Sequence, residues 1–360
     1  MRTLPVLIRP RRPALDGIGL PLVSVVKHDD LVRRNDLFKE LSSRVIGQRS
    51  AIRQIVPYVH MYQAGLAPEG RPAGVFLLLG PTGTGKTRTV EALAEVLHGS
   101  ARSLLRVDCG EFQMEHEVAK LIGAPPGYLG HRETQPMLTQ QKLGAAVSES
   151  SSLALVLFDE IEKAAPSMTR LLLGVLDKAI LRLGDNTQVN FERSMIFMTS
   201  NLGAKAMQKQ IHPDFGFESM LPPTETRRGL EKKLEHEGMR AMRRAFSPEF
   251  INRIDAVLTY QPLDAAALAV IVDQQIAELE RHIENRLEMR AFGLAISIGA
   301  RAWLLKKGTS AEYGARELKR TILRSLTQPL AAMVASGAIE PGDMVRAEVE
   351  ADILILTVEA

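Results

Sequence analysis

The sequence is poor in the residues on which several classes of protein depend. It has one cysteine, Cys109, among 360 residues, which excludes an intrachain disulfide and a cysteine-rich zinc site and indicates a reducing, cytoplasmic compartment. Aromatic residues make up only 5% of the chain. No apolar run approaches the ~18 residues that a membrane-spanning helix needs. We therefore expect a cytoplasmic protein with no membrane partner.

The chain also lacks a dominant charge. It carries 45 basic and 42 acidic residues, for a net charge of +3. Proteins that bind nucleic acid usually present a basic excess or exposed aromatic side chains, and neither is indicated here. A hydrophobic content of 45% still allows a full core. The length predicts two domains, with three as the alternative. The balanced charge predicts no nucleic-acid partner.

A phosphate-binding loop is the strongest motif that the sequence contains. Residues 80–87 read Gly-Pro-Thr-Gly-Thr-Gly-Lys-Thr and fill every fixed position of the pattern G-x-x-x-x-G-K-[ST]. An apolar run over 75–79 precedes the loop, and a helical pattern follows it. Glycines let successive N–H groups point at one phosphate, and the helix dipole adds to the attraction. We expect Lys86 to reach the β- and γ-phosphates and the Thr87 hydroxyl to hold Mg²⁺.

Strand-like and helix-like segments alternate over the first 260 residues or so. Strands are predicted over 75–79, 104–108, 153–158, 194–199 and 256–260. Helices are predicted over 50–64, 87–97, 111–122, 135–149, 167–181 and 226–246. This alternation predicts an α/β fold, with a five-stranded parallel sheet flanked by helices.

The pattern changes after Gln261, which indicates a second, smaller α+β domain. Helices are predicted over 264–287, 301–307 and 315–334, the last bent near Pro329, with short strands over 294–298, 345–349 and 353–358. The expected domains are an N-terminal extension (1–35), a large nucleotide-binding domain (36–261) and a small C-terminal domain (262–360).

Polar residues follow two of the predicted strands. Asp159 and Glu160 come directly after the apolar strand at 153–158. Asp159 is expected to hold Mg²⁺, and Glu160 to polarise a water for attack on the γ-phosphate. Asn201 lies two residues past the fourth strand. It could position that water or cap the next helix, and the residues alone leave both roles open.

Two arginines lie where a nucleotide could use a cation. Arg253 is near the end of the large domain, from where it could reach the γ-phosphate held by a neighbouring subunit. A salt bridge to Glu249 or Asp255 is the alternative. Arg316 opens a predicted helix, where the dipole disfavours a cation. That position indicates that its charge serves an anion.

Seven motifs in a fixed order show a resemblance to a known family. The matching stretches are RVIGQ (44–48), GPTGTGKT (80–87), LIGAPPGYLG (121–130), LFDEIEKA (157–164), MTSNLG (198–203), PEFINRID (248–255) and YGAREL followed by KR (313–320). Together they cover about residues 36–360. The chain resembles the C-terminal ATPase module of the Clp-type AAA+ unfoldases, the ClpA, ClpB and ClpC group, as a single-ring protein.

The resemblance implies an ATPase that works as a hexameric ring and threads polypeptide through a central pore. It implies an adenine pocket at Val45 and Ile46, sensor 1 at Asn201, the arginine finger at Arg253 and sensor 2 at Arg316. The expected ATP- and Mg²⁺-binding residues are Val45, Ile46, Gly80, Pro81, Thr82, Gly83, Thr84, Gly85, Lys86, Thr87 and Asp159, with Thr87 and Asp159 on the metal. The expected catalytic residues are Glu160, Asn201, Arg253 and Arg316.

Residues 127–130 match the pore loop of that family. Prolines and glycines in 123–130 prevent regular structure, so Tyr128, between Gly127 and Leu129, would be an exposed and mobile grip on an extended chain. A tyrosine folded back onto its own domain is the alternative. Peptidase-docking members carry an aliphatic-Gly-hydrophobic tripeptide, which Phe215-Gly216-Phe217 matches imperfectly; a local hydrophobic contact is the alternative there.

Two functions of different kinds follow from these features. The first is an ATP-dependent unfoldase or remodelling chaperone that acts on polypeptide substrates, with an adaptor to supply them. The second is a non-threading nucleotide switch, a scaffold ATPase that assembles on ATP and recruits one protein partner.

Overall fold

The large part of the molecule is built on one parallel sheet. The computed structural model describes residues 37–124, 135–204, 206–207, 223–287, 291–309 and 314–359. The sheet has the strand order β2-β3-β6-β1-β7, and all of its pairings are parallel. Its strands are β1 (Gly74–Leu79), β2 (Leu105–Asp108), β3 (Ala154–Asp159), β6 (Ser194–Ser200) and β7 (Ala256–Thr259). The predicted five-stranded parallel sheet is confirmed.

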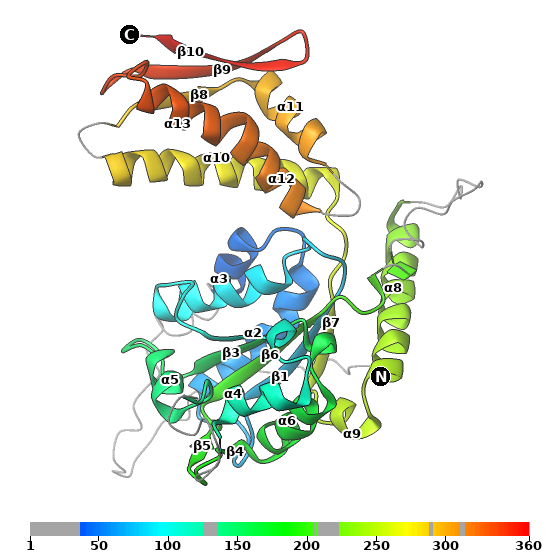
Figure 1. The fold of residues 1–360 in the computed structure, drawn as a ribbon. Coiled ribbons are helices and arrows are strands. Elements are labelled where there is room, and N and C mark those ends of the chain that lie inside the picture. The colour runs from blue at the N-terminus through cyan, green and yellow to red at the C-terminus, as the bar shows by residue number, and fades with distance from the viewer. Residues whose placement is uncertain are drawn as a thin grey trace, which may run out of the picture.

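Helices cover both faces of this sheet (Figure 1). They are α2 (Arg49–Gln63), α3 (Lys86–His98), α6 (Pro166–Lys178), α8 (Pro223–Ala245) and α9 (Pro248–Ile251). Alternate side chains of β1 enter two separate cores. Phe76 and Leu78 pack with α2 and α3, whereas Val75 and Leu77 pack with α6 and the end of α8. Strands covered on both faces are apolar at every position, which explains the uninterrupted apolar runs.

The C-terminal part has a core of its own. Its elements are α10 (Ala265–Leu287), β8 (Gly293–Ile296), α11 (Ile298–Gly308), α12 (Ala315–Ile322), α13 (Gln328–Ala335), β9 (Met344–Glu350) and β10 (Ile353–Glu359). β9 pairs antiparallel with β10 and parallel with β8. Helices α10 and α12 lie between this small sheet and the large part (Figure 1). The predicted α+β unit after the large sheet is confirmed.

Two of the predicted helices are much shorter than the sequence pattern suggested. The segment predicted as one helix over 111–122 consists of η1 (Cys109–Glu111), η2 (Glu115–Glu117) and α4 (Val118–Ile122). The Glu117 carboxylate accepts the N–H of Met114 and starts a new turn there. The helix predicted over 135–149 is reduced to α5 (Gln140–Ala145). The serine-rich stretch after it forms an isolated bridge between Ser148 and Ser151.

A β-hairpin replaces the end of the helix predicted over 167–181. α6 stops at Lys178, where Ala179 adopts a φ of 51°, and the chain continues as β4 (Ile180–Arg182) and β5 (Gln188–Asn190). The N–H of Gly184, in the hairpin turn, donates to the carbonyl oxygen of Ile122 at 2.9 Å. The hairpin therefore holds the C-terminal end of α4.

The predicted bend near Pro329 corresponds to a π-helical turn, η5 (Leu323–Thr327), between α12 and α13. Proline has no N–H to donate to the carbonyl four residues earlier, and its ring crowds that carbonyl, so the turn widens just before Pro329.

Three predicted features lie outside the described residues: the extension over 1–35, the loop over 127–130 and the tripeptide over 215–217. Among the residues that the structure does describe, no helix is both long and apolar enough to cross a membrane.

Tyr260 provides a test of how the sheet is tied to α3. Its ring is fully buried, and its hydroxyl donates to Thr89 Oγ1 at 2.8 Å. We predict that Tyr260→Phe lowers the free energy of unfolding by about 1 kcal/mol, because Thr89 loses a buried partner. Urea denaturation measures this change. Tyr62→Phe is the matched control, since it loses only an exposed hydrogen bond to Ser152; equal losses in the two variants would contradict the role given to burial.

Candidate functional site

The loop over residues 80–87 joins β1 to α3, and its path depends on glycine. Gly80, Gly83 and Gly85 have φ values of 153°, 75° and 99°, a region that side chains rarely adopt. A Cβ on Gly80 would also lie 2.6 Å from the carbonyl oxygen of Tyr260. The loop therefore curls tightly against the start of α3, whose first N–H groups have no intrahelical partner and can meet an anion.

Lys86 folds back over this loop. Its Nζ donates to the carbonyl oxygens of Gly80 at 2.7 Å and Pro81 at 2.9 Å, and to Asn201 Oδ1 at 2.9 Å. Burial lowers the pKa of Lys86 to about 8; Glu162 acts in the opposite direction, and Arg316 adds to the lowering. The three oxygens that hold the ammonium carry only partial charge. A phosphate would be a stronger partner.

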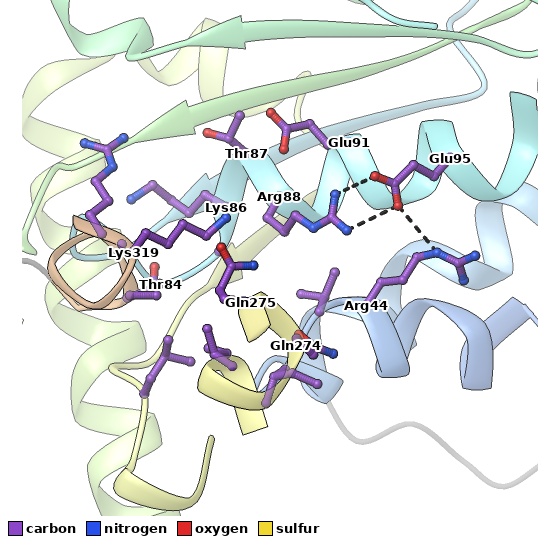
Figure 2. Close-up of a pocket in the computed structure, with 18 of the residues that line it drawn as sticks. Arg44, Thr84, Lys86, Thr87, Arg88, Glu91, Glu95, Gln274, Gln275 and Lys319 are labelled. Carbon is purple, nitrogen blue, oxygen red and sulfur yellow. Dashed lines mark hydrogen bonds and ion pairs between the residues drawn. The ribbon is translucent and has the colours of Figure 1, made fainter. Parts of the chain in front are cut away.

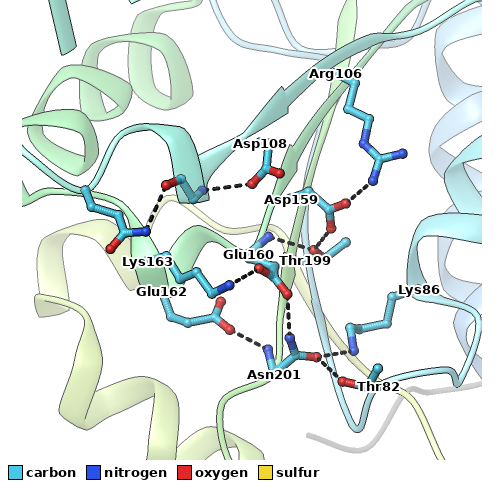
Figure 3. A network of polar contacts seen from close by, with 12 residues as sticks. Thr82, Lys86, Arg106, Asp108, Asp159, Glu160, Glu162, Lys163, Thr199 and Asn201 are labelled. Carbon is cyan, nitrogen blue, oxygen red and sulfur yellow. Dashed lines mark hydrogen bonds and ion pairs between the residues drawn. The ribbon is translucent and has the colours of Figure 1, made fainter. Parts of the chain in front are cut away.

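Asp159 ends β3 at the same edge of the sheet. Thr199, on the neighbouring strand β6, donates its hydroxyl to Asp159 Oδ1. Arg106, on β2, forms an ion pair with Asp159 Oδ2. Both carboxylate oxygens are thus held by residues of adjacent strands (Figure 3). These two contacts hold the Asp159 carboxylate in one orientation at the edge of the cleft.

Glu160 follows with a φ of 56°, an unusual conformation for a residue with a side chain. Its N–H donates to Thr199 Oγ1 at 3.0 Å. Its carboxylate accepts from Asn201 Nδ2 at 3.2 Å and forms an ion pair with Lys163. The hydrogen bond to Glu160 raises the pKa of Lys163. The left-handed turn directs Glu160 away from Asp159, so the two adjacent carboxylates make separate sets of contacts.

Asn201 lies at the centre of this polar network (Figure 3). Its Oδ1 accepts from Lys86 and, at 3.5 Å, from Thr82, while its Nδ2 donates to Glu160. The side chain therefore bridges the phosphate loop and the acid, which favours the water-positioning role over the helix-capping one. Glu162, which sequence reasoning missed, accepts the backbone N–H of Asn201 at 2.9 Å and holds it in place.

Gln48 ends the RVIGQ motif, but the sequence alone assigned it no role of its own. It is 3% exposed, and its Nε2 donates to the carbonyl oxygens of Thr84 at 3.0 Å and Gln261 at 2.8 Å. Its Oε1 accepts the N–H of Gln261. Gln48 thus ties the phosphate loop to the segment that leads into the C-terminal part. The neighbouring Val45 is buried, and both Val45 and Ile46 line the cleft described next.

The C-terminal part forms one wall of a cleft of about 980 Å³ over the phosphate loop. The N–H of Ala315, at the start of α12, donates to the carbonyl oxygen of Gly83 at 3.1 Å. Gln274, Gln275 and Lys319 face α3 across the cleft (Figure 2). Arg316 lines the same cleft as Lys86, and among the described residues no acidic side chain pairs with it. Two cations from different parts of the chain thus converge on one space.

Arg253 is not among the residues that line this cleft. It pairs with Glu249 at 3.1 Å and with Asp177 at 3.6 Å. One of the two salt bridges considered from the sequence is therefore formed. The other is not, because Asp255 instead accepts from Arg71 and from the backbone N–H of Val75.

Comparison with protein families shows which family the chain belongs to. Residues 71–257, over half of the chain, match the family described as "AAA domain (Cdc48 subfamily)". The chain belongs to the AAA family. Residues 263–347 match a second family, the "C-terminal, D2-small domain, of ClpB protein". AAA domains are ATPases, which implies that this chain binds a nucleotide.

Curated relatives and solved structures extend this likeness beyond the AAA domain. The chaperone protein ClpB of Rhodopseudomonas palustris is 37% identical over 319 residues, which cover 88% of this chain and 33% of the relative. ClpB of Mycobacterium tuberculosis strain H37Rv is 37% identical over 328 residues, covering 91% and 34%. The chain spans about a third of the length of the curated relatives that it matches.

Two solved structures of Hsp104 share the fold. The S. cerevisiae Hsp104:casein complex in an extended conformation has a TM-score of 0.75 at 28% identity and covers 94% of this AAA chain and 53% of that one. A closed-state Hsp104 structure with ATPγS and FITC casein has a TM-score of 0.73 at 28% identity, with 92% and 53% covered.

The donor set of the AAA site fits a nucleotide-bound Mg²⁺. Such an ion takes only one or two protein oxygens, because phosphates and water supply the rest. The Thr87 hydroxyl and the Asp159 carboxylate line the same cleft and offer these oxygens. A protein-only metal site is not needed; within the described ranges, no group of three or more His, Cys, Asp or Glu could hold a metal ion.

The lowered pKa of Lys86 predicts a pH dependence of nucleotide affinity. Phosphate binding favours the protonated lysine, so affinity should be constant below pH 8, where Lys86 is already charged. Above that pH, binding must take up a proton, and affinity should fall about tenfold per pH unit. Titration of Mg²⁺-free ADP between pH 7 and 9.5 measures this. Lys86→Arg, which stays charged, should give a flat profile; a flat profile for the unaltered chain would contradict the prediction.

Proposed function

We propose that this chain is an ATP-dependent protein unfoldase or remodelling chaperone. The observation that carries the proposal is the cleft itself, where a phosphate-binding loop, two oriented carboxylates and an amide meet a cation from the C-terminal part. Its likeness to ClpB chaperones over about 90% of its length supports the same activity.

The positions of the side chains suggest a role for each in ATP hydrolysis. Lys86 would leave the carbonyl oxygens of its own loop for the β- and γ-phosphates. Thr87 and Asp159 would hold Mg²⁺, which neutralises phosphate charge when bound. Glu160, with Asn201 beside it, would accept a proton from the attacking water. The adenine would lie against Val45 and Ile46, which line the same cleft.

Arg316 would contribute a second positive charge from the C-terminal part. Because α12 is hydrogen-bonded to the loop through Ala315 and Gly83, a change in phosphate charge at Arg316 can move the C-terminal part relative to the sheet. We propose domain limits of 36–261 and 262–360 on either side of this joint. The separate hydrophobic core of the C-terminal part supports this division.

Arg253 would act in trans, in a ring of identical subunits. It does not line the cleft of its own chain, where it instead pairs with Glu249 and Asp177. The alternative is that Arg253 reaches the nucleotide bound by a neighbouring subunit. In other nucleotidases, an arginine supplied by a second protein stabilises the negative charge of the phosphoryl-transfer transition state. We propose a homo-oligomer on this basis. A hexamer is proposed from the likeness to ClpB chaperones, and a cytoplasmic location from the single cysteine.

Mixing of variants tests the trans assignment. Glu160→Gln should abolish hydrolysis while ATP binding persists, because glutamine keeps the hydrogen bond to Asn201 but cannot accept the proton. Arg253→Ala should also be inactive alone. Mixed after subunit exchange, the two should regain ATPase activity, because an intact Glu160 then meets an intact Arg253 across one interface. Phosphate release measures this. No recovery on mixing, despite proven exchange, would contradict action in trans.

The substrate proposal rests on Tyr128 and is tested separately. We predict that Tyr128→Ala abolishes unfolding of a tagged fluorescent reporter and leaves basal ATP hydrolysis within about twofold, because Tyr128 is not among the residues expected to bind ATP. Tyr128→Phe keeps the aromatic ring and is the matched control. Loss of unfolding in both variants, or in neither, would contradict a ring-dependent grip.

A non-threading nucleotide switch remains the second candidate. It predicts ATP-dependent assembly with no reporter unfolding by the unaltered chain, so the same assay separates the two functions. An adaptor that supplies substrate, and a peptidase that docks at Phe215-Gly216-Phe217, are further partners of the unfoldase proposal. Pull-down of a ring-shaped peptidase that is lost in Gly216→Ala would support the latter.

A further inference from the structure

Arg106 is a cation in the cleft that the chemistry above does not use. It lies on β2, with half of its side chain exposed (50%), and its Nη2 forms an ion pair with Oδ2 of Asp159. Its Nη1 lies 3.7 Å from Oε1 of Glu91, on α3. Arg106, Asp159 and Glu91 all line the cleft, and Figure 3 shows Arg106 on the side of Asp159 away from Lys86.

Each oxygen of the Asp159 carboxylate already has one partner. Oδ1 accepts from the Thr199 hydroxyl, and Oδ2 is held by Arg106. A metal ion near Asp159 would therefore meet a like charge that already occupies the same carboxylate.

Glu91 offers Arg106 a second position. The 3.7 Å separation of the two side chains is too long for a good hydrogen bond and short enough for an ion pair. Among the described residues, Glu91 has no closer charged partner. A small rotation of Arg106 would thus exchange one carboxylate for another within the cleft.

We propose that Arg106 is the counter-ion of Asp159 in the metal-free site and moves to Glu91 when Mg²⁺-nucleotide binds. Arg106 then sets the Mg²⁺ concentration that the site requires. The inference rests on the proposed ATP site. Under this proposal, loss of Arg106 strengthens Mg²⁺ binding. If Arg106 only oriented Asp159 for the metal, its loss would weaken Mg²⁺ binding.

The test is a Mg²⁺ titration of a fluorescent ADP analogue bound to the full chain, which needs no hydrolysis. Arg106→Ala should lower the Mg²⁺ concentration at half-maximal binding by about two- to fivefold, the range of a half-exposed ion pair. Glu91→Gln should raise it, because Arg106 loses its second position. Arg106→Lys, which keeps the charge without the planar fork, should lie between the unaltered chain and Arg106→Ala.

Two controls match these charge changes. Arg88→Ala removes a cation from the same cleft, where Arg88 pairs with Glu95 at 2.6 Å. Glu95→Gln removes the acid of that pair. In both variants, the Mg²⁺ concentration at half-maximal binding should stay near that of the unaltered chain.

A raised or unchanged Mg²⁺ concentration at half-maximal binding in both Arg106 variants, with melting temperatures near that of the unaltered chain, would overturn the inference alone. No Mg²⁺-dependent nucleotide binding by the unaltered chain would overturn the proposed ATP site as well.

Discussion

The buried ammonium of Lys86 is the constraint on which the rest of the site depends. A charge in that position needs several oxygens close by, since burial without partners is costly. The structure supplies them from a tight glycine loop and from Asn201 on a different strand. This in turn requires β1 and β6 to be neighbours in the sheet, and it requires Gly80, which approaches the Tyr260 carbonyl too closely for any side chain.

The same constraint extends to the C-terminal part. α12 meets the loop through the Ala315–Gly83 hydrogen bond, and Gln48 joins Thr84 to Gln261 at the start of the connection. Both contacts use the backbone of the phosphate loop, so the loop cannot adjust to a nucleotide without acting on them. The site is thus a joint between two parts as well as a place for chemistry, as the proposed coupling of hydrolysis to movement requires.

The sequence was sufficient for the parts of the site that depend on local pattern. Apolar runs predicted all five strands, and the loop motif predicted the turn before α3, because both signals lie in consecutive residues. Arg106, Glu162 and Gln48 carried no such signal. Their importance comes from partners that are distant in the chain, such as Gln261, which lies 213 positions after Gln48. Only the assembled fold brings those partners together. The hairpin at β4 and β5 was missed for a related reason, since the apolar residues before it fit a helix equally well.

A structure of the chain with Mg²⁺ and a slowly hydrolysed ATP analogue would show directly whether both parts of the chain bind one nucleotide. We predict that Lys86 Nζ leaves the Gly80 and Pro81 oxygens and contacts the β- and γ-phosphates, and that Arg316 contacts the same nucleotide from the opposite wall. A nucleotide bound elsewhere, or one that touches the large part alone while Lys86 keeps its present partners, would contradict the central claim.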